Sequence, residues 1–329
     1  MHPAASSKEA PAGRRPYSLG DWDNRSAVRS RKSSYQLPPH SELEQELQTR
    51  DWFPPAFIPY FADPAVQHAG RTVQQRLAAN HLVYFLHYTT ILEHKIVNRS
   101  VETLIHGELA IELPETMKIA ALQLYTDEGY HALFSFKLAE QVANGYAMPA
   151  WQPLPRRIRL MHDLLARCAD SQRPLAWFLL GFVSETIIAK ELLSITGDGL
   201  VSTVYQMFRE HLEDEARHSR YFSEVFDYVW ARLSPQQQVF SASQLIDIIF
   251  IFAAVDQEWL SASLNESGIP LAAAHAAIHS LIQPSAEVLR ARSIAGATLQ
   301  AMKRAGFFEH DDNLSLIHIS EPTRQEAIS

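Results

Sequence analysis

One stretch of the chain, "FREHLEDEARHSRYF" at residues 208–222, has the spacing of an amphipathic helix but carries polar residues on its apolar face. Residues three and four apart share one face of a helix, and a soluble protein turns its apolar face inward. A buried carboxylate costs several kcal/mol unless it is paired or bound to a metal, so the fold must compensate for these groups. The inward face contains Val204, Phe208, His211, Glu215, His218, Phe222, Val225 and Val229.

Three other predicted helices, 64–98, 114–144 and 174–196, also place acids at mid-length on their apolar faces. These faces offer no Lys or Arg, so histidines are the groups left to compensate the acids. Acids and histidines that converge in a dry interior favour a divalent metal site over a salt-bridge network. The polar residues on these three faces are Glu93, Glu128, His131 and Glu185.

The Glu-x-x-His spacing is weak evidence by itself, because a chain with 15 histidines yields about one such match by chance. Two matches on apolar faces, beside two helices that each supply a lone Glu, carry more weight. Ferritin-like di-iron and di-manganese bundles have this arrangement. A ligand set of His and carboxylate without thiolate favours Fe or Mn over structural zinc. We therefore predict an all-α fold, a ferritin-like di-metal helical bundle with additional flanking helices, that binds two iron ions, with Mn as the alternative.

Three further polar residues belong to the same helices. Asp127 and Asp214 each precede the Glu of a Glu-x-x-His element, and we expect them to hold the free ring N–H of ligand histidines. The alternative for both acids is a solvated helix surface. His211 shares a face with Glu215 and His218. It is either a core histidine hydrogen-bonded to a neighbour or a seventh ligand.

Composition and the positions of Pro and Gly residues predict the domain organisation. We predict a partly disordered N-terminal arm at 1–50, the di-metal domain at 51–310 and an irregular tail at 311–329. Pro and Gly residues, which commonly mark where helices begin and end, predict later helices at 155–169, 200–233, 235–264, 270–282 and 284–305.

The chain as a whole has an ordinary globular composition. Of its 329 residues 47% are hydrophobic, and its formal net charge of −8 argues against binding to nucleic acid. The longest apolar run, 248–255, is too short to span a membrane, and the first residues lack the apolar core of a signal peptide. The single cysteine, Cys168, fits a reducing compartment. We expect a cytoplasmic protein with no membrane or nucleic-acid partner.

The segments around the predicted ligands resemble the AurF-type di-iron N-oxygenases, a family named for the p-aminobenzoate N-oxygenase. The resemblance covers about residues 50–310 and includes "IPYFADP" and "AAVDQEWLSASLNESGI" outside the metal helices. The His-x-x-x-Glu-x-x-His element is its most specific part. The motifs are "ILEHKIVN", "YTDEGYH", "FVSETIIA" and "HLEDEARH". By resemblance, the two irons are bound by Glu93, Glu128, His131, Glu185, His211, Glu215 and His218.

The resemblance implies a non-haem di-iron monooxygenase that uses O₂ to oxidise an amine nitrogen. A reduced di-iron centre would bind O₂ as a peroxo-bridged diferric species and transfer oxygen, giving a hydroxylamine. Further oxidation to a nitroso or nitro group is left open. It also implies a role in secondary metabolism. Since such chemistry needs two electrons per O₂, we expect an external donor, a ferredoxin or a flavin reductase. Many such bundles dimerise, but the sequence leaves a homodimer open.

Two other function classes stay open on the sequence. A di-metal oxidase could instead perform C–H hydroxylation, desaturation or radical generation, and an iron-binding or storage protein would need no substrate. A small-molecule amine, aryl or aliphatic, is the expected substrate, because the residues flanking the ligands are small, apolar or aromatic. The expected pocket residues are Phe85, Tyr88, Thr89, Phe178, Gly181, Phe182 and Ala189.

The part of the helix that precedes Glu93 contains Phe85 and Tyr88 but no Arg near Glu93. This departs from family members that act on aryl carboxylates, where a cationic or polar group is expected to hold the carboxylate. Arg290 or Arg292 could supply that group from a later helix, and the alternative for both is an ordinary surface arginine.

Overall fold

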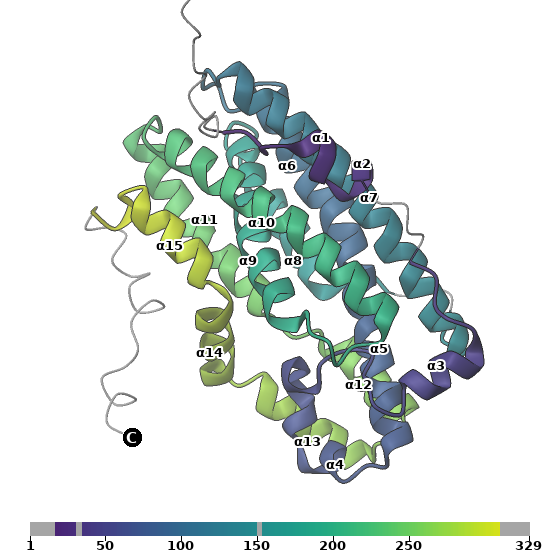
Figure 1. Cartoon of the computed structure of the whole chain (residues 1–329). Helices are drawn as coiled ribbons and strands as arrows, with labels where there is room; N and C mark the ends of the chain where they lie inside the picture. The colour runs from purple at the N-terminus through teal and green to yellow at the C-terminus, as the bar shows by residue number, and fades with distance from the viewer. Residues whose placement is uncertain (1–16, 31–34, 150–152, 310–329) are drawn as a thin grey trace, which may run out of the picture.

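The computed structural model describes residues 17–30, 35–149 and 153–309 (Figure 1). Throughout these ranges the regular structure is helical, and extended backbone pairs only in an isolated bridge between Asp51 and Leu200. The predicted all-α fold is therefore confirmed. The predicted tail at 311–329 lies outside the described residues.

Four long segments form the centre of the bundle. The first is α5 (Arg71–Ile91), which continues without a break through a π-helical turn, η3 (Leu92–Val97), into α6 (Asn98–Ile105). The others are α7 (Glu115–Gly145), α9 (Arg173–Ile195) and α10 (Ser202–Trp230). The main contacts pair α5 with α7 and α9 with α10, while η3 touches both α7 and α9. Their apolar faces meet inside the bundle, as the three- and four-residue spacing predicted.

Shorter elements surround these helices. Before the bundle come α1 (Trp22–Arg25), α2 (Ala27–Ser30), α3 (His40–Glu46), η1 (Pro55–Phe57), η2 (Pro59–Ala62) and α4 (Pro64–Gln67). After α7 and α10 come α8 (Arg156–Arg167), α11 (Pro235–Ala253), α12 (Gln257–Glu266), α13 (Leu271–Leu281), α14 (Pro284–Ile294), α15 (Gly296–Arg304) and η4 (Phe307–Glu309).

Three predicted helices are each divided in two. Gly70, which has no helical φ and ψ, separates α4 from α5, so the prediction of one helix at 64–98 was wrong. Asp256 ends the extended link after α11 and caps α12 by accepting a hydrogen bond from the backbone N–H of Trp259. The third division falls at Ala295, between α14 and α15. The apolar periodicity of the sequence continues across these three breaks, so periodicity alone did not predict where the helices divide.

The described part of the N-terminal arm lies against the bundle. Leu19, Ala27 and Tyr35 are buried, and the backbone N–H of Ala27 donates to a carboxylate of α10. Residues 17–30 and 35–50 thus contribute to the core of the domain from which we had separated them. The remainder of the arm, residues 1–16, lies outside the described residues.

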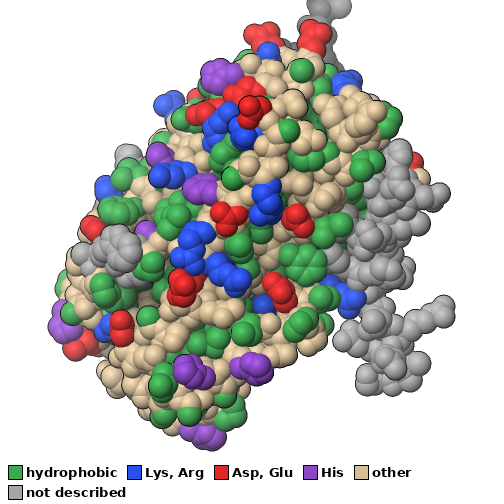
Figure 2. Space-filling view, turned by 180° about the vertical axis from the view of Figure 1, so that it is seen from behind, with side chains coloured by type: hydrophobic (Ala, Val, Ile, Leu, Met, Phe, Trp, Pro, Cys, Tyr) green, Lys and Arg blue, Asp and Glu red, His purple; other side chains and the backbone are tan. Residues whose placement is uncertain are grey.

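One described stretch, Pro235–Glu266, is apolar and long enough to cross a membrane by length and composition. Half of the window is buried inside the protein, and the stretch comprises two helices, α11 and α12. The first of these packs against α9, α14 and α8, so its apolar surface is used within the fold. Figure 2 shows the face opposite to that of Figure 1, where acidic and basic side chains are interspersed.

Candidate metal centre

The first predicted ligand, Glu93, lies in the π-helical turn η3. A π turn inserts an extra residue into an α-helix and is common at functional sites because it redirects the side chains around it. The carboxylate of Glu93 is fully buried and lies 2.9 Å from Nε2 of His211 on α10.

The other six predicted ligands come from α7, α9 and α10, and all six are buried. Five of these six residues, together with Glu93, form two groups in which one potential ligand atom from each residue lies within 4.8 Å of the others. One group contains Glu93, His131, His211 and Glu215, and the other contains Glu128, His131, Glu215 and His218. Glu185 adjoins the second group, with Oε2 3.5 Å from Nδ1 of His218. The structure thus brings all seven residues together.

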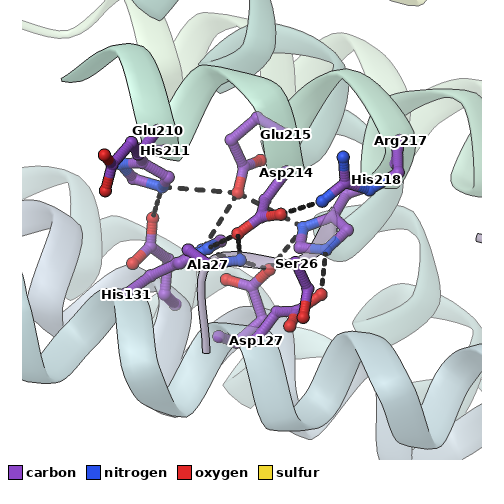
Figure 3. A network of polar contacts seen from close by, with 12 residues as sticks. Ser26, Ala27, Asp127, His131, Glu210, His211, Asp214, Glu215, Arg217 and His218 are labelled. Carbon is purple, nitrogen blue, oxygen red and sulfur yellow. Dashed lines mark hydrogen bonds and ion pairs between the residues drawn. The ribbon is translucent and has the colours of Figure 1, made fainter. Parts of the chain in front are cut away.

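Glu215 lies between the two groups (Figure 3). Its Oε1 is 3.2 Å from Nδ1 of His131, 3.3 Å from Nε2 of His211 and 3.3 Å from Nδ1 of His218. Because Glu215 belongs to both groups, its carboxylate could contribute to the binding of two cations.

The contacts inside the cluster fit metal ligation better than hydrogen bonding. Both carboxylate oxygens of Glu93, Glu128 and Glu185 are buried without a hydrogen bond. The short distance of 2.8 Å between Glu128 Oε1 and His218 Nδ1 also lacks hydrogen-bond geometry. Buried polar atoms are almost always satisfied, so this many orphaned acceptors in one place need an explanation. Lone pairs that converge on two cations provide one, and the donor set of Glu and His suits iron.

The free ring nitrogens of two histidines are held crosswise between α7 and α10. Nε2 of His131 lies 3.0 Å from Oδ2 of Asp214, and Nε2 of His218 lies 3.1 Å from Oδ2 of Asp127. Each acid therefore contacts a histidine of the opposite helix, and Nδ1 of each ring is left to face the cluster. This is the role expected of the two acids.

Groups that the sequence did not indicate fix these two acids in turn. Trp22 donates its indole N–H to Asp127 over 2.8 Å, and the backbone N–H of Ala27 donates to Asp214 over 3.0 Å. Arg217 forms an ion pair with Asp214. Trp22 and Ala27 lie in the N-terminal segment, which has no helical periodicity that could have revealed them.

Charges within the cluster shift the pKa values of its members in opposite directions. Burial, reinforced by the charge of Glu215, raises the pKa of Glu128 to about 7. Burial would also raise the pKa of Glu215, but the charge of His218 and the close approach of His131 and His211 outweigh it and hold that pKa well below its usual range. Burial likewise opposes protonation of His131 and His218, yet hydrogen bonds and charges from neighbouring acids hold both pKa values well above normal.

A cavity of about 310 Å³ lies between α5, α9 and the helices that follow α10. Its lining includes Tyr88 and Ile187, which stand five residues before Glu93 and two residues after Glu185. Aromatic rings make up much of the wall: Phe53, Tyr60, Tyr84, Phe85, Tyr88, Phe252 and Trp259.

Only two of the expected pocket residues, Phe85 and Tyr88, line this cavity. Phe178 stacks near Phe222, and Phe182 stacks on Phe226 with ring centroids 4.2 Å apart. Gly181 faces Ser100 on α6, Thr89 is buried, and Ala189 is half-buried outside the cavity wall. The side of α9 that faces the ligand helices is thus filled by packing, and the cavity lies further along the helix.

The cavity contains a cationic side chain that the sequence did not point to. Arg157, at the start of α8, lies with its guanidinium carbon 5.5 Å from the ring centroid of Tyr88. Its Nε donates to the carbonyl of Ala254. Arg290 also lines the cavity, but it donates to the carbonyls of Ala253 and Leu281, whereas Arg292 does not line it.

Comparison with known proteins agrees with this site. No curated protein matches the chain. The sequence pattern of the p-aminobenzoate N-oxygenase AurF family matches residues 19–302, which span the four ligand-bearing segments and the N-terminal segment that supports Asp127 and Asp214. The family has a ferritin-like di-iron helical fold. The chain belongs to the p-aminobenzoate N-oxygenase AurF family.

Proposed function

We propose that this chain is an O₂-dependent di-iron N-oxygenase that converts an amine to a hydroxylamine. The observation that carries the proposal is the buried set of four glutamates and three histidines, in which both carboxylate oxygens of three glutamates lack hydrogen bonds. The residues that would hold the two ions are Glu93, Glu128, His131, Glu185, His211, Glu215 and His218. Two iron ions bound there would supply the O₂ activation and the oxygen transfer.

The protein's own groups would orient the ligands and exclude water. Asp127 and Asp214 fix the ring orientation of His218 and His131, so that Nδ1 of each faces the metals. The cluster is fully buried, which keeps bulk water from the reacting centre. For one turnover, an amine, O₂, two electrons and two protons would give the hydroxylamine and water.

The aromatic cavity supports an arylamine as the substrate. A flat ring would pack against the aromatic side chains that line the cavity. Arg157 could hold an acidic or carbonyl group at the far end of the ring, since a guanidinium binds such groups through paired hydrogen bonds. It takes the role for which Arg290 and Arg292 had been considered.

An external electron donor is part of the proposal, because each proposed turnover consumes two electrons. A ferredoxin or a flavin reductase is the donor class that we propose. Cys168 is a free thiol, which supports a reducing, cytoplasmic setting. We also propose a role in secondary metabolism, on the strength of the family alone.

The deciding experiment is a single turnover with ¹⁸O₂. Protein loaded with Fe(II) without oxygen, and chemically reduced, is mixed with ¹⁸O₂ and either an arylamine or an aliphatic amine of similar size. The proposal expects one ¹⁸O on nitrogen of the arylamine product by mass spectrometry. Labelled carbon, or an unsaturated product without label, would favour hydroxylation or desaturation. Oxidation of iron without any substrate product would favour iron storage.

A further inference from the structure

The candidate ligands are fully buried, yet one line of side chains connects them to the protein surface. Nε2 of His218 lies 3.1 Å from Oδ2 of Asp127 (Figure 3), and the same Oδ2 accepts the indole N–H of Trp22 over 2.8 Å. Trp22 is half-buried in α1, so part of its ring is accessible from outside. Two successive hydrogen bonds therefore join a candidate ligand to an aromatic ring at the surface.

The counterpart acid, Asp214, contacts His131 in the same way but has different neighbours. It forms an ion pair with Arg217 and accepts from the backbone N–H of Ala27. A cation compensates a buried carboxylate better than a neutral donor does. Within the described chain no Lys or Arg pairs with Asp127, and its Oδ1 is buried without a hydrogen bond. Compensation of charge thus accounts for the surroundings of Asp214, but it does not account for an indole beside Asp127.

Other aromatic side chains near the cluster lack such a continuous connection. The hydroxyl of Tyr35 donates to Glu210, which belongs to neither group of candidate ligands. Tyr130 is half-buried and reaches His131 through the ring of Phe134, with centroids 5.4 and 5.3 Å apart and no hydrogen bond on the way. Among the described side chains, Trp22 alone combines a surface aromatic ring with an unbroken line of hydrogen bonds to a candidate ligand.

We propose that electrons from an external donor reach the metal centre through Trp22, Asp127 and His218. The inference rests on the proposed function, because the path leads to the proposed pair of irons. In each transfer one electron leaves the donor, a one-electron protein reductant such as a ferredoxin, and reduces one iron from Fe(III) to Fe(II). Two transfers supply the two electrons that a turnover consumes. No bond forms or breaks along the path, and the indole keeps its N–H proton.

A photoreductant attached beside Trp22 tests the path without depending on how a donor docks. Asn24→Cys, in a Cys168→Ala background, gives the full chain one thiol, at an exposed position two residues from Trp22. A ruthenium polypyridyl complex on that thiol, excited by a laser pulse beside a sacrificial reductant, injects one electron. The loss of ferric absorbance, without substrate or O₂, gives the rate of reduction.

Two variants of Trp22 should slow this reduction. Trp22→Phe keeps a ring but has no N–H, and the rate should fall by about tenfold, the lower end of what the outer partners of metal ligands contribute. Trp22→Gln keeps an N–H donor near Asp127 but has no aromatic ring, and it should be at least as slow. If Trp22→Gln were reduced as fast as the unaltered chain, the ring would have no part in the path and the proposal would be overturned.

Trp177→Phe is the matched control and should leave the rate unchanged. Trp177 lies on α9 and is half-buried, as Trp22 is. Each of the two rings also has an arginine beside it. The guanidinium carbon of Arg99 lies 5.8 Å from the ring centroid of Trp177, and that of Arg29 lies 5.9 Å from the ring centroid of Trp22.

The iron content and the midpoint potential of the same samples distinguish the possible outcomes. Slower reduction at unchanged iron content and potential is the expected result, whereas slowing that follows a shifted potential would give Trp22 a structural role and overturn the path. Equal rates in iron-loaded variants would also overturn the path, but would leave the proposed N-oxygenase function intact. A rate that depends on Trp22 in a protein that oxidises no amine would support the path and contradict that function. A chain that takes up no iron would overturn both.

Discussion

Nε2 of His218 lies 3.1 Å from Oδ2 of Asp127, an acid that belongs to the other Glu-x-x-His helix. His131 and Asp214 repeat the relationship in the opposite direction over 3.0 Å. The two helices are thus tied together through the ligand histidines, and each ring is oriented by the helix that it faces. The same contacts position the candidate ligands His131 and His218 and join α7 to α10.

Removing the charge of either acid should weaken metal binding. Asp127→Asn and Asp214→Asn should each raise the dissociation constant for Fe(II) by about 10- to 100-fold, because an amide neither orients the ring as firmly nor raises its basicity. A competition titration with a chelator measures this. Asp227→Asn, an exposed acid on α10, is the control and should bind iron as the unaltered chain does. Equal affinity in all four proteins would show that the crosswise contacts are only structural.

Gly181 should be intolerant of any side chain for a packing reason. A Cβ there would overlap the side chain of Ser100, with its Cβ 2.6 Å away, so α9 and α6 could not approach as they do. Gly181→Ala should lower the free energy of unfolding by about 1 to 3 kcal/mol. Adding Ser100→Gly should recover part of this loss, as a double-mutant cycle in urea would show. Gly145→Ala, where a Cβ meets nothing, should be neutral. A cycle without coupling would mean that the two residues do not touch.

His81 should give the protein a dependence of stability on pH that is separate from the metal site. Burial, assisted by the charge of Arg157, lowers the pKa of His81 to about 3. The unfolded chain binds a proton there near pH 6.5, so below that pH protons favour the unfolded state and stability falls as the pH falls. The loss approaches about 1.4 kcal/mol per pH unit below pH 6.

His81→Phe should remove this dependence, since a phenyl ring can keep the edge contacts with Phe53 and Trp259. Urea unfolding at pH 7, 6, 5 and 4 would measure the difference between the variant and the unaltered chain. That difference should grow in favour of the variant by about 1 kcal/mol per pH unit. His275→Phe, at an exposed position on α13, serves as the control. A constant difference across these pH values would contradict the buried neutral histidine.

Arg157→Met should distinguish substrates by charge. The change keeps most of the side-chain length but removes the guanidinium from the cavity. If Arg157 holds an acidic group, the KM for an acidic arylamine should rise by about tenfold or more, while that for an uncharged arylamine of the same shape changes little. Arg159→Met, at a position on α8 outside the cavity lining, is the control. Equal effects on both substrates would assign Arg157 a structural role.

The convergence of buried Glu and His side chains was largely predictable from the sequence. Helical spacing fixes which residues share a face, and the cost of burying Glu128 or Glu215 without a partner requires compensation nearby. Four helices with polar groups at mid-length could satisfy that requirement only by converging. The π turn at Glu93 was not predictable, because no local residue pattern signals the extra residue.

The surroundings of the cluster depended on contacts that spacing does not encode. Trp22 reaches Asp127 across 105 positions in the sequence, from a segment without periodicity. The position of the cavity depends on the angles between helices, so residues near Glu185 that seemed suited to a pocket are packed against α10 and α6 instead. Arg157 lies on a helix that carries none of the ligands, and only the fold brings it to Tyr88.

The most direct test of the metal centre is the iron content of the full chain, purified after growth with iron under reducing, anaerobic conditions. Elemental analysis should give about two irons per chain, as in other bundles with this ligand pattern. Glu215→Gln should lose most of both, because Glu215 belongs to both ligand groups, while Glu213→Gln, exposed on the same helix, should keep them. A folded protein that holds almost no iron, and takes up none when Fe(II) is added, would contradict the account.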